Sequence, residues 1–330
     1  MQSFKSFREG LFHINYQNFN DYALNLFSFQ AKNNPVYAQY LTTLDIDLAE
    51  VKHFSQIPCL PISFFKRHRI TTESWKEQRI YESSGTMGLN TSRHYVRDEN
   101  FYFKNCEKIF NRFYGPLLDY HTLFLLPGYI ERGNSSLVSM AQYFIDRTES
   151  KHSGFYLSNH SALLKIIEKI KNEKGTRKIL LCGVSFALMD LAESYDIDLG
   201  NDVIVMETGG MKGRRREIVR EELHSFLCRK LNVSKIHSEY GMTELSSQAY
   251  STGDGKFRTP PWMRVLLRDT NDPFDVGDKK SGAINVIDLA NISSCSFIET
   301  QDLGRLNSSG ELEILGRFDN SDVRGCNLMV

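Results

Sequence analysis

The stretch Lys178-Ile179-Leu180-Leu181-Cys182 is an apolar run that ends at the small-residue turn Gly183-Val184-Ser185. A continuous run of this length is typical of a strand that is covered on both faces of a sheet. A helical pattern follows at 186–195, and Val203-Ile204-Val205-Met206-Glu207 repeats the strand before a second helix at about 216–231. This alternation predicts βαβ units and therefore an α/β fold with a mostly parallel sheet.

The same alternation extends toward the N-terminus. Leu123-Phe124-Leu125-Leu126 is another apolar run, and helical patterns flank it at 102–114 and 158–171. The first forty residues carry many aromatic side chains at helical spacing, which predicts a packed helical section. The segment 57–66 contains two prolines, so we expect it to be extended.

The character of the chain changes after Tyr250. Short apolar runs alternate there with turns rich in Asp, Asn, Gly and Ser, and no convincing helix lies between them. This pattern predicts a small antiparallel β subdomain. The predicted strands are 263–268, 283–289, 295–299 and 311–315.

Composition restricts the possible function. The 330 residues include 40 basic and 40 acidic side chains, so no overall field attracts nucleic acid or an anionic membrane. The apolar runs are too short to span a bilayer, and the first residues lack the pattern of a signal peptide, so we expect a cytoplasmic globular protein. Scattered cysteines favour free thiols over a zinc site. They are Cys59, Cys106, Cys182, Cys228, Cys295 and Cys326.

Ser83-Ser84-Gly85-Thr86-Met87-Gly88 is a run of small and hydroxylated residues after a predicted short strand at 79–82. Glycine permits backbone angles that other residues avoid, so such a turn can direct several N–H groups at one anion. The run lacks the Gly-Lys-Ser/Thr ending of a P-loop. From its residues alone it is either a phosphate cradle or an ordinary turn.

Ser238-Glu239-Tyr240-Gly241-Met242-Thr243-Glu244 follows another predicted strand. Its tyrosine offers a flat face for a base, its threonine an oxygen for phosphate contact, and its glutamate a ligand for Mg²⁺. The block could hold a nucleotide or form a plain strand-to-helix turn. Further on, Asp302 in an expected Asp-Leu-Gly turn could accept hydrogen bonds from two ribose hydroxyls, and Gly316-Arg317 begins a charged segment.

The order of these blocks is more informative than any one of them. Ser-Ser-Gly-Thr-x-Gly, a Gly-Gly turn after a strand, Tyr-Gly-Met-Thr-Glu, Asp-Leu-Gly and Gly-Arg-x-Asp follow one another between Tyr81 and Gly325. This series resembles the adenylate-forming superfamily of acyl-CoA synthetases, nonribosomal adenylation domains and luciferases. The aromatic N-terminus, the segment 60–66 and the ending at 324–329 resemble most the acyl-protein synthetases, the fatty-acid activating subunits of the bacterial luciferase fatty-acid reductase.

The resemblance implies ATP, Mg²⁺ and a fatty or other carboxylic acid as ligands, and it assigns a role to each block. Thr243 would contact the α-phosphate, and Glu244 would ligate Mg²⁺. These two residues would be catalytic. The residues that would contact the ATP phosphates are Ser83, Ser84, Gly85, Thr86 and Gly88.

The nucleoside is assigned in the same way. Gly209 and Gly210 would border the adenine ring, with Tyr240 stacked on it. Asp302 and Arg317 would hold the ribose. Attack of a carboxylate on the α-phosphorus needs charge neutralisation and in-line positioning more than a covalent nucleophile, so these residue types suit the reaction.

The resemblance also implies a domain plan. Residues 1–318 would be the adenylate-forming core, with its β-rich part at about 251–318, and 319–330 a hinge remnant and tail. The mobile C-terminal domain of most relatives would be absent. In acyl-protein synthetases a cysteine near the C-terminus accepts the acyl group as a thioester, and Cys326 matches it. The partner would be an acyl-CoA reductase-like protein or an acyl carrier.

Other functions remain open from the sequence. The acyl group could pass to CoA or a carrier, as in phenylacetate-CoA ligases. An ATP-independent acyltransferase or esterase could use Ser185, in a turn that approximates a nucleophile elbow, or His94, which stands four residues before Asp98. A nucleotide-binding scaffold without catalysis is a further possibility. The basic residues Lys212 and 214–216 form either a solvated face or a docking patch for an acidic partner.

Overall fold

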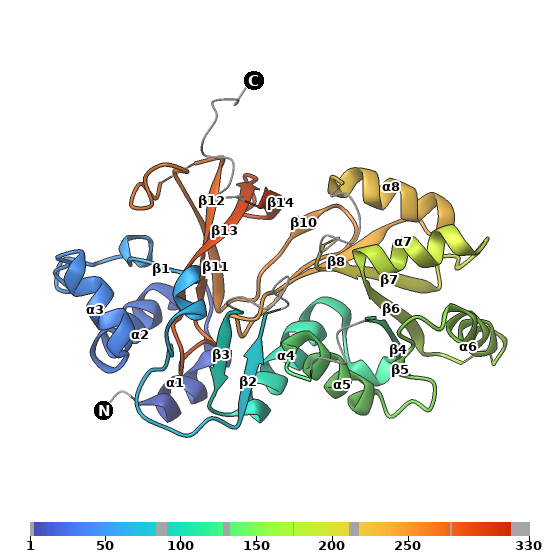
Figure 1. Cartoon of the computed structure of the whole chain (residues 1–330), viewed down its shortest axis with the longest axis horizontal. Helices are drawn as coiled ribbons and strands as arrows, with labels where there is room; N and C mark the ends of the chain where they lie inside the picture. Colours follow the sequence, from blue (N-terminus) through green and yellow to red (C-terminus); the bar gives the residue numbers. More distant parts are fainter. Residues whose placement is uncertain are drawn as a thin grey trace.

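The computed structural model describes residues 3–83, 91–127, 133–173, 175–210, 218–277 and 279–317. Two six-stranded sheets and one two-stranded hairpin organise this part of the chain. Helices cover both faces of one sheet, and an N-terminal helical section packs beside the other (Figure 1). Within the described residues, no helix combines the length and apolarity that crossing a membrane requires.

The first sheet has the strand order β5-β4-β6-β7-β8-β9. Its neighbours are parallel as far as β8, and β9 closes the edge antiparallel to β8. The apolar runs of the sequence correspond to β4, β6 and β7, which confirms the predicted α/β fold. The strands are Tyr120–Leu125 (β4), Gly154–Phe155 (β5), Lys178–Val184 (β6), Val203–Thr208 (β7), Ile236–Tyr240 (β8) and Ala249–Ser251 (β9).

The helices of this layer begin at polar caps. The Asp98 carboxylate accepts from the Phe101 N–H at the start of α4, and Asn159 caps α6. Figure 1 shows α7 and α8 together on one face of the sheet and α4 and α5 on the other. The helices are Glu99–Tyr114 (α4), Ser136–Thr148 (α5), His160–Asn172 (α6), Ser185–Ser194 (α7) and Arg220–Leu231 (α8), so α8 begins later than the predicted 216.

The second sheet is the predicted antiparallel subdomain, in the order β10-β14-β13-β12-β11. The short strand β1 adds to it in parallel beside β13. The strands are Leu60–Pro61 (β1), Lys256–Phe257 (β10), Met263–Arg268 (β11), Ser281–Asp288 (β12), Phe297–Leu306 (β13) and Leu312–Arg317 (β14).

The predicted Asp-Leu-Gly turn is wrong, because Asp302 lies inside the long strand β13. The pairing with β14 shifts register between Leu303 and Gly304. A Cβ on Gly304 would lie 2.8 Å from side-chain carbons of Ile284 and Leu312. The glycine therefore allows two neighbouring side chains to close over a bulged strand rather than turning the chain.

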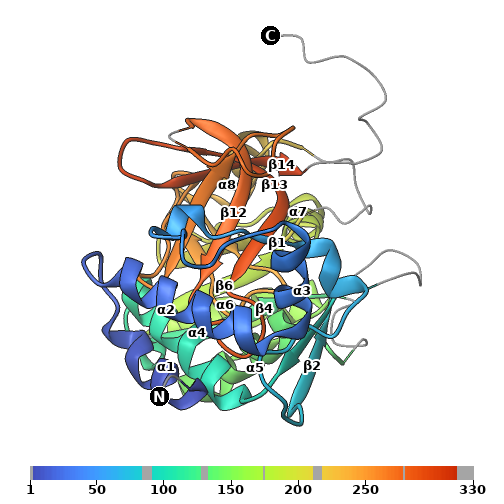
Figure 2. The same ribbon diagram turned by 90° about the vertical axis from the view of Figure 1, so that its left-hand side faces the viewer.

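The N-terminal section is helical, as predicted. Figure 2 shows α2 and α3 side by side, below the antiparallel strands. The buried amide of Gln30 in α2 donates to the carbonyl oxygens of Asn291 and Ile292 at 3.1 and 3.0 Å, which ties α2 to the β12–β13 connection. The helices are Phe4–Gly10 (α1), Phe19–Asn33 (α2) and Pro35–Thr43 (α3).

Short 3₁₀ turns join these elements, and one of them corrects a prediction. The segment expected to be extended at 57–66 ends in the 3₁₀ helix η3, Ile62–Lys66. Pro61 occupies its N-cap, where the fixed φ of proline suits the start of a helical turn. The others are Leu11–His13 (η1), Phe54–Gln56 (η2) and Leu117–Asp119 (η4).

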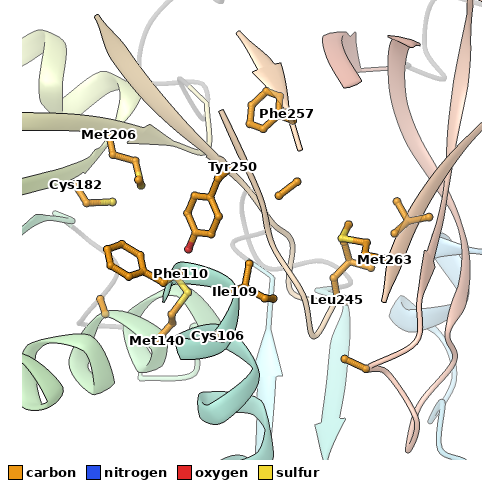
Figure 3. Packing of buried hydrophobic residues seen from close by; sticks show 14 of the residues in the cluster. Cys106, Ile109, Phe110, Met140, Cys182, Met206, Leu245, Tyr250, Phe257 and Met263 are labelled. Atoms are coloured by element: carbon orange, nitrogen blue, oxygen red, sulfur yellow. The ribbon is translucent and has the colours of Figure 1, made fainter. Parts of the chain in front are cut away.

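The hydrophobic core is continuous under both sheets. Figure 3 shows Phe110 of α4 close to Cys106, Met140 and Tyr250. Phe110 is 1% exposed and contacts the rings of Tyr120 and Tyr250, with centroids 5.4 and 6.4 Å apart. Because these partners lie on β4 and on the edge strand β9, Phe110 packs α4 against two distant strands of this sheet.

The hairpin of β2 (Arg79–Glu82) and β3 (Arg93–Val96) carries a buried histidine. His94 is 4% exposed, and its Nδ1–H donates to the Thr243 carbonyl oxygen at 2.8 Å. Burial lowers the pKa of His94 to about 4, although the bonds to Thr243 and Asn291 act in the opposite direction. His94 is therefore neutral at pH 7 and joins the hairpin to the segment after β8.

Phe110→Ala should lower the free energy of unfolding by about 3–5 kcal/mol, because truncation leaves a cavity between α4 and the sheet. Phe274→Ala is the matched control, since that ring is 56% exposed and its loss should change stability by no more than about 0.5 kcal/mol. Urea denaturation of both variants measures the difference. Equal effects would contradict the assignment of Phe110 to the core.

His94→Gln should flatten the dependence of stability on pH. The unfolded histidine binds a proton near its ordinary pKa of 6.5, whereas the folded one does so only near 4. Stability is thus complete above pH 6.5 and falls as the pH drops toward 4, with a slope of about 1.4 kcal/mol per pH unit for one proton. Glutamine keeps an amide donor but cannot titrate. Denaturant unfolding between pH 4.5 and 7.5 should show a slope reduced by about one proton, and an unchanged slope would refute the prediction.

Candidate functional site

The candidate site lies where the carboxyl ends of β7 and β8 meet β13 and β14 of the antiparallel sheet. Ligands of open α/β sheets bind outside the carboxyl ends of the strands. Strand β8 ends at Tyr240, and Thr243 and Glu244 follow in the next turn. Strand β7 ends at Thr208, directly before Gly209 and Gly210. The topology therefore brings together two blocks that are about thirty residues apart in the sequence.

Three carbonyl oxygens of the turn after β8 accept hydrogen bonds from side chains of other parts of the fold. His94 donates to the Thr243 oxygen, and the Asn291 amide donates to the Glu244 oxygen at 2.8 Å. The Asn105 amide of α4 donates to the Ser246 oxygen at 2.7 Å. Three separate parts of the fold thus fix this backbone.

The N–H groups of the same turn are bound as well. The buried carboxylate of Asp288, at the end of β12, accepts from the N–H groups of Ser246 and Ser247, both at 2.8 Å, and from the Ser247 hydroxyl at 2.7 Å. Burial raises the pKa of Asp288, and these donors counteract that effect. The turn is pre-organised before any ligand binds.

Glu244 is 5% exposed, and burial raises the pKa of its carboxyl. A hydrogen bond with Ser92 and the positive charges of Arg317 and Lys66 act in the opposite direction. Ser92 is also joined to Ser83 by two hydrogen bonds. The Ser83 N–H donates to the Ser92 carbonyl oxygen at 3.0 Å, and the Ser92 N–H donates to the Ser83 hydroxyl oxygen at 2.9 Å. Ser83 is thereby brought close to Glu244.

A single buried carboxylate fits a magnesium ion that is held mainly by substrate phosphates. Mg²⁺ keeps several waters and takes one or two protein carboxylates in nucleotide sites. In the described part of the chain, no group of three or more His, Cys, Asp or Glu side chains could enclose a metal without other ligands. Glu244 is the residue of this turn that could supply one carboxylate to such an ion.

Tyr240, Asp302 and Arg317 form one connected group. The Tyr240 hydroxyl donates to Asp302 Oδ2 at 2.7 Å, and Arg317 Nε lies 3.8 Å from Asp302 Oδ1. Asp302 and Arg317 are direct cross-strand partners in β13 and β14. Burial raises the pKa of Asp302, whereas the Tyr240 bond and the Arg317 charge lower it. Arg317 is 67% exposed, so it can turn toward a ligand.

Gly209 has φ of +67°, which side-chain-bearing residues rarely adopt, and it is exposed. Its carbonyl accepts from the Ser185 hydroxyl at 3.2 Å, and the same hydroxyl donates to Glu207 Oε2 at 3.1 Å. Ser185 is 2% exposed. Its bonds to a carboxylate and a carbonyl support the Gly209-Gly210 turn and differ from those of an exposed serine paired with a histidine base.

The alternative catalytic residues His94 and Asp98 also have other contacts in the structure. His94 binds the Thr243 carbonyl, whereas Asp98 caps α4 and forms an ion pair with Arg8. The two side chains thus serve different elements. Each has a structural role that accounts for its position.

Sequence reasoning missed the buried Glu239. Its carboxylate accepts from the Thr208 hydroxyl, and burial raises its pKa to about 7. A Cβ on Gly241 would lie 2.5 Å from Glu239 Oε1, so the glycine leaves room for this carboxylate. Asn105, Asp288 and Asn291, whose side chains bind the backbone of the turn after β8, were missed too. They lie far from the motif in the sequence, so no local pattern marks them.

Several predicted residues lie outside the described residues. They are Ser84, Gly85, Thr86 and Gly88 of the proposed cradle, the acceptor Cys326, and the basic residues Lys212, Arg214, Arg215 and Arg216.

Comparison with solved structures places the fold. ATP-bound MatB from Rhodopseudomonas palustris matches with a TM-score of 0.53 at 15% identity, covering 72% of this chain and 47% of that one. The AMP complex of O-succinylbenzoate coenzyme A synthetase (MenE) from Bacillus subtilis matches with a TM-score of 0.51 at 18% identity, covering 74% and 49%. The chain thus has the fold of adenylate-forming enzymes and spans about half the length of these proteins.

A search of curated proteins gave no match. A family model does match. The model of the acyl-protein synthetase LuxE covers residues 135–330, more than half of the chain. It includes β6 to β14 and therefore the turns after β7 and β8, together with the Asp302–Arg317 pair. The chain belongs to the acyl-protein synthetase (LuxE) family.

Proposed function

We propose that the protein activates a fatty or similar carboxylic acid with ATP as an acyl adenylate and then transfers the acyl group to Cys326. Membership of the LuxE family supports this activity. The observation that carries the proposal is the convergence of Glu244 with Tyr240, Asp302 and Arg317, which come from separate blocks of the sequence but meet at one junction of the two sheets.

The nucleoside binds at the antiparallel side of this junction. The Gly209-Gly210 turn borders the adenine, since it exposes backbone without a Cβ in the way. The Tyr240 ring faces the base, held in orientation by its hydroxyl bond to Asp302. Asp302 accepts from the ribose hydroxyls, and Arg317 adds a cation at the same edge.

The phosphates bind at the hairpin side, against the run from Ser83 to Gly88, Thr243 and Glu244. Mg²⁺ held by Glu244 would neutralise part of the phosphate charge. An oxygen of the substrate carboxylate attacks the α-phosphorus, the bond from that phosphorus to the bridging oxygen breaks, and pyrophosphate leaves. The fixed backbone at 243–247 keeps the Thr243 hydroxyl and the Glu244 carboxylate in place during this step.

Cys326 completes the second step. Its thiolate attacks the acyl carbonyl, the carbon–oxygen bond to AMP breaks, and the thiol proton passes to solvent. The five described cysteines are free but poorly suited, because burial raises the pKa of each thiol, to about 12 for Cys106 and Cys295. Eight residues lie between Arg317 and Cys326, and a fully extended chain of this length reaches at most about 30 Å.

The acyl thioester would then be delivered to a partner, an acyl-CoA reductase-like protein or an acyl carrier. In this account residues 1–318 form the activating core and 319–330 the acyl-carrying tail. We place the reaction in the cytoplasm, where thiols stay reduced.

Glu244→Gln should lower acid-dependent ATP–pyrophosphate exchange by about 100-fold or more, because the variant loses the charge that would hold Mg²⁺ while keeping the shape of the side chain. Burial raises the pKa of this carboxyl, so a neutral amide should be tolerated by the fold. Glu168→Gln, on the exposed face of α6, is the control and should keep full exchange. Normal exchange in Glu244→Gln would count against the assigned role.

Cys326→Ala should retain pyrophosphate exchange but lose covalent labelling by radioactive fatty acid. The wild type should carry label that hydroxylamine releases, as expected for a thioester. Cys228→Ala removes the one described cysteine that is partly exposed and should label normally. Label that persists in Cys326→Ala would exclude this cysteine as the acceptor.

The same assay separates the alternatives. Direct product formation on CoA or a carrier by Cys326→Ala would favour a CoA or carrier ligase. Acyl transfer without ATP would favour an acyltransferase or esterase. Absence of carboxylate-dependent ATP–pyrophosphate exchange in the wild type would favour a nucleotide-binding scaffold without catalysis.

A further inference from the structure

The carboxylate of Glu207, close to the Gly209-Gly210 turn, is approached by three polar side chains. It is 3% exposed and accepts from Ser185 at 3.1 Å and from Arg220 Nε at 3.2 Å. His224 Nε2 lies 3.5 Å from it. Ser185 also binds the Gly209 carbonyl, so the carboxylate and the turn are held as one unit.

Arg220 reaches from this junction to the other sheet. Its Nε binds Glu207 at the end of β7, and its Nη1 donates to the Ile314 carbonyl of β14 at 3.1 Å. Strand β10 pairs with β14 only at 312 and 313, so Arg220 takes the next position along that edge. Arg220 therefore donates a hydrogen bond to the Ile314 carbonyl oxygen at a position where β10 no longer pairs with β14.

A stacked ring strengthens the link. The Arg220 guanidinium lies 4.9 Å from the ring centroid of Phe257 in β10, and the Phe257 ring contacts Tyr240 edge to face at 6.0 Å. Phe257 is 1% exposed. Arg220 therefore contacts Glu207 on the adenine side and the Ile314 carbonyl of β14 on the ribose side. It also contacts Phe257, whose ring packs against Tyr240.

We propose that Arg220 is a positioning residue that sets the distance between the adenine turn at Gly209-Gly210 and the ribose-binding pair Asp302–Arg317. The inference rests on the proposed ATP-dependent activation and adds a residue to which the proposed function assigns no contact with substrate. Arg317 lies three residues beyond Ile314 on the same strand, so a shift of β14 moves it directly.

The charges facing Glu207 agree with this assignment. Burial alone would raise its pKa, but the hydrogen bond from His224, the Arg220 charge and the Ser238 hydroxyl together hold the pKa below its usual value. Glu207 is therefore ionised at neutral pH and binds the guanidinium as a charged group. A planar, two-ended donor is needed, because one nitrogen serves the carboxylate and another the carbonyl.

Three variants distinguish a positioning role of Arg220 from a contribution to the stability of the fold alone. Arg220→Lys keeps the charge beside Glu207, but an ammonium group lacks the second fixed donor for Ile314. Glu207→Gln combined with Arg220→Gln removes both charges, so no buried carboxylate is left unpaired. Arg147→Gln, which breaks the 3.0 Å ion pair between Arg147 of α5 and Glu107 of α4, controls for loss of an ion pair elsewhere.

The measurement is acid-dependent pyrophosphate exchange with KM determined separately for ATP and for the acid, alongside thermal unfolding and amide hydrogen exchange of 312–317. We expect Arg220→Lys and the double variant to unfold near the wild-type temperature. Their KM for ATP should rise about 10-fold, their KM for the acid should change less than about 2-fold, and exchange in β14 should be faster. Arg147→Gln should match the wild type in both KM values.

An unchanged KM for ATP in a folded Arg220→Lys and in the double variant would overturn the proposal. So would equal increases in both KM values, which indicate a general loss of order. If the wild type itself shows no exchange, the proposed activation fails first, and the role of Arg220 fails with it. A raised KM for ATP in Arg220→Lys together with a wild-type KM in the double variant would show an ion pair that only stabilises the fold, and it would also overturn the proposal.

Discussion

The hydrogen bonds that fix the backbone at 243–247 are the constraint on which the site depends. His94, Asn105 and Asn291 bind its carbonyl oxygens, and Asp288 binds its N–H groups. These side chains come from the hairpin, from α4 and from the end and outgoing turn of β12. The site can therefore form only when the parallel sheet, the antiparallel sheet and the hairpin are all assembled.

Three buried glutamates at this junction have different environments. Glu207 is paired with a guanidinium, and its pKa is held low. Glu239 receives one hydroxyl donor, and burial raises its pKa to about 7. Glu244 is buried beside Ser92 with the charges of Lys66 and Arg317 near it. The first organises the fold around the turn after β7, whereas the third is the one that we propose as a ligand of Mg²⁺. Their environments, not their residue type, separate their roles.

Much of the architecture could be predicted from the sequence because it depends on local patterns. The unbroken apolar runs gave β4, β6 and β7, since parallel strands covered on both faces have no polar alternation. The bulged strand β13 could not be predicted, because Asp-Leu-Gly is a turn signal, and only the packing of Ile284 and Leu312 over Gly304 explains its extended form. The same limit applies to the site. The motifs located Tyr240 and Asp302. The hydrogen bonds that fix the turn after β8 and those made by Arg220 could not be predicted, because they join residues that are 13 to 149 positions apart.

The central claim is that activation proceeds through an acyl adenylate, and an oxygen-isotope experiment tests it most directly. The protein would be incubated with ATP, Mg²⁺ and a fatty acid labelled with ¹⁸O in both carboxylate oxygens, and the released AMP analysed by mass spectrometry. Attack of the carboxylate on the α-phosphorus leaves one acid oxygen on that phosphorus after acyl transfer. The account predicts AMP with a single ¹⁸O atom. Unlabelled AMP, or ¹⁸O in phosphate together with ADP, would contradict it.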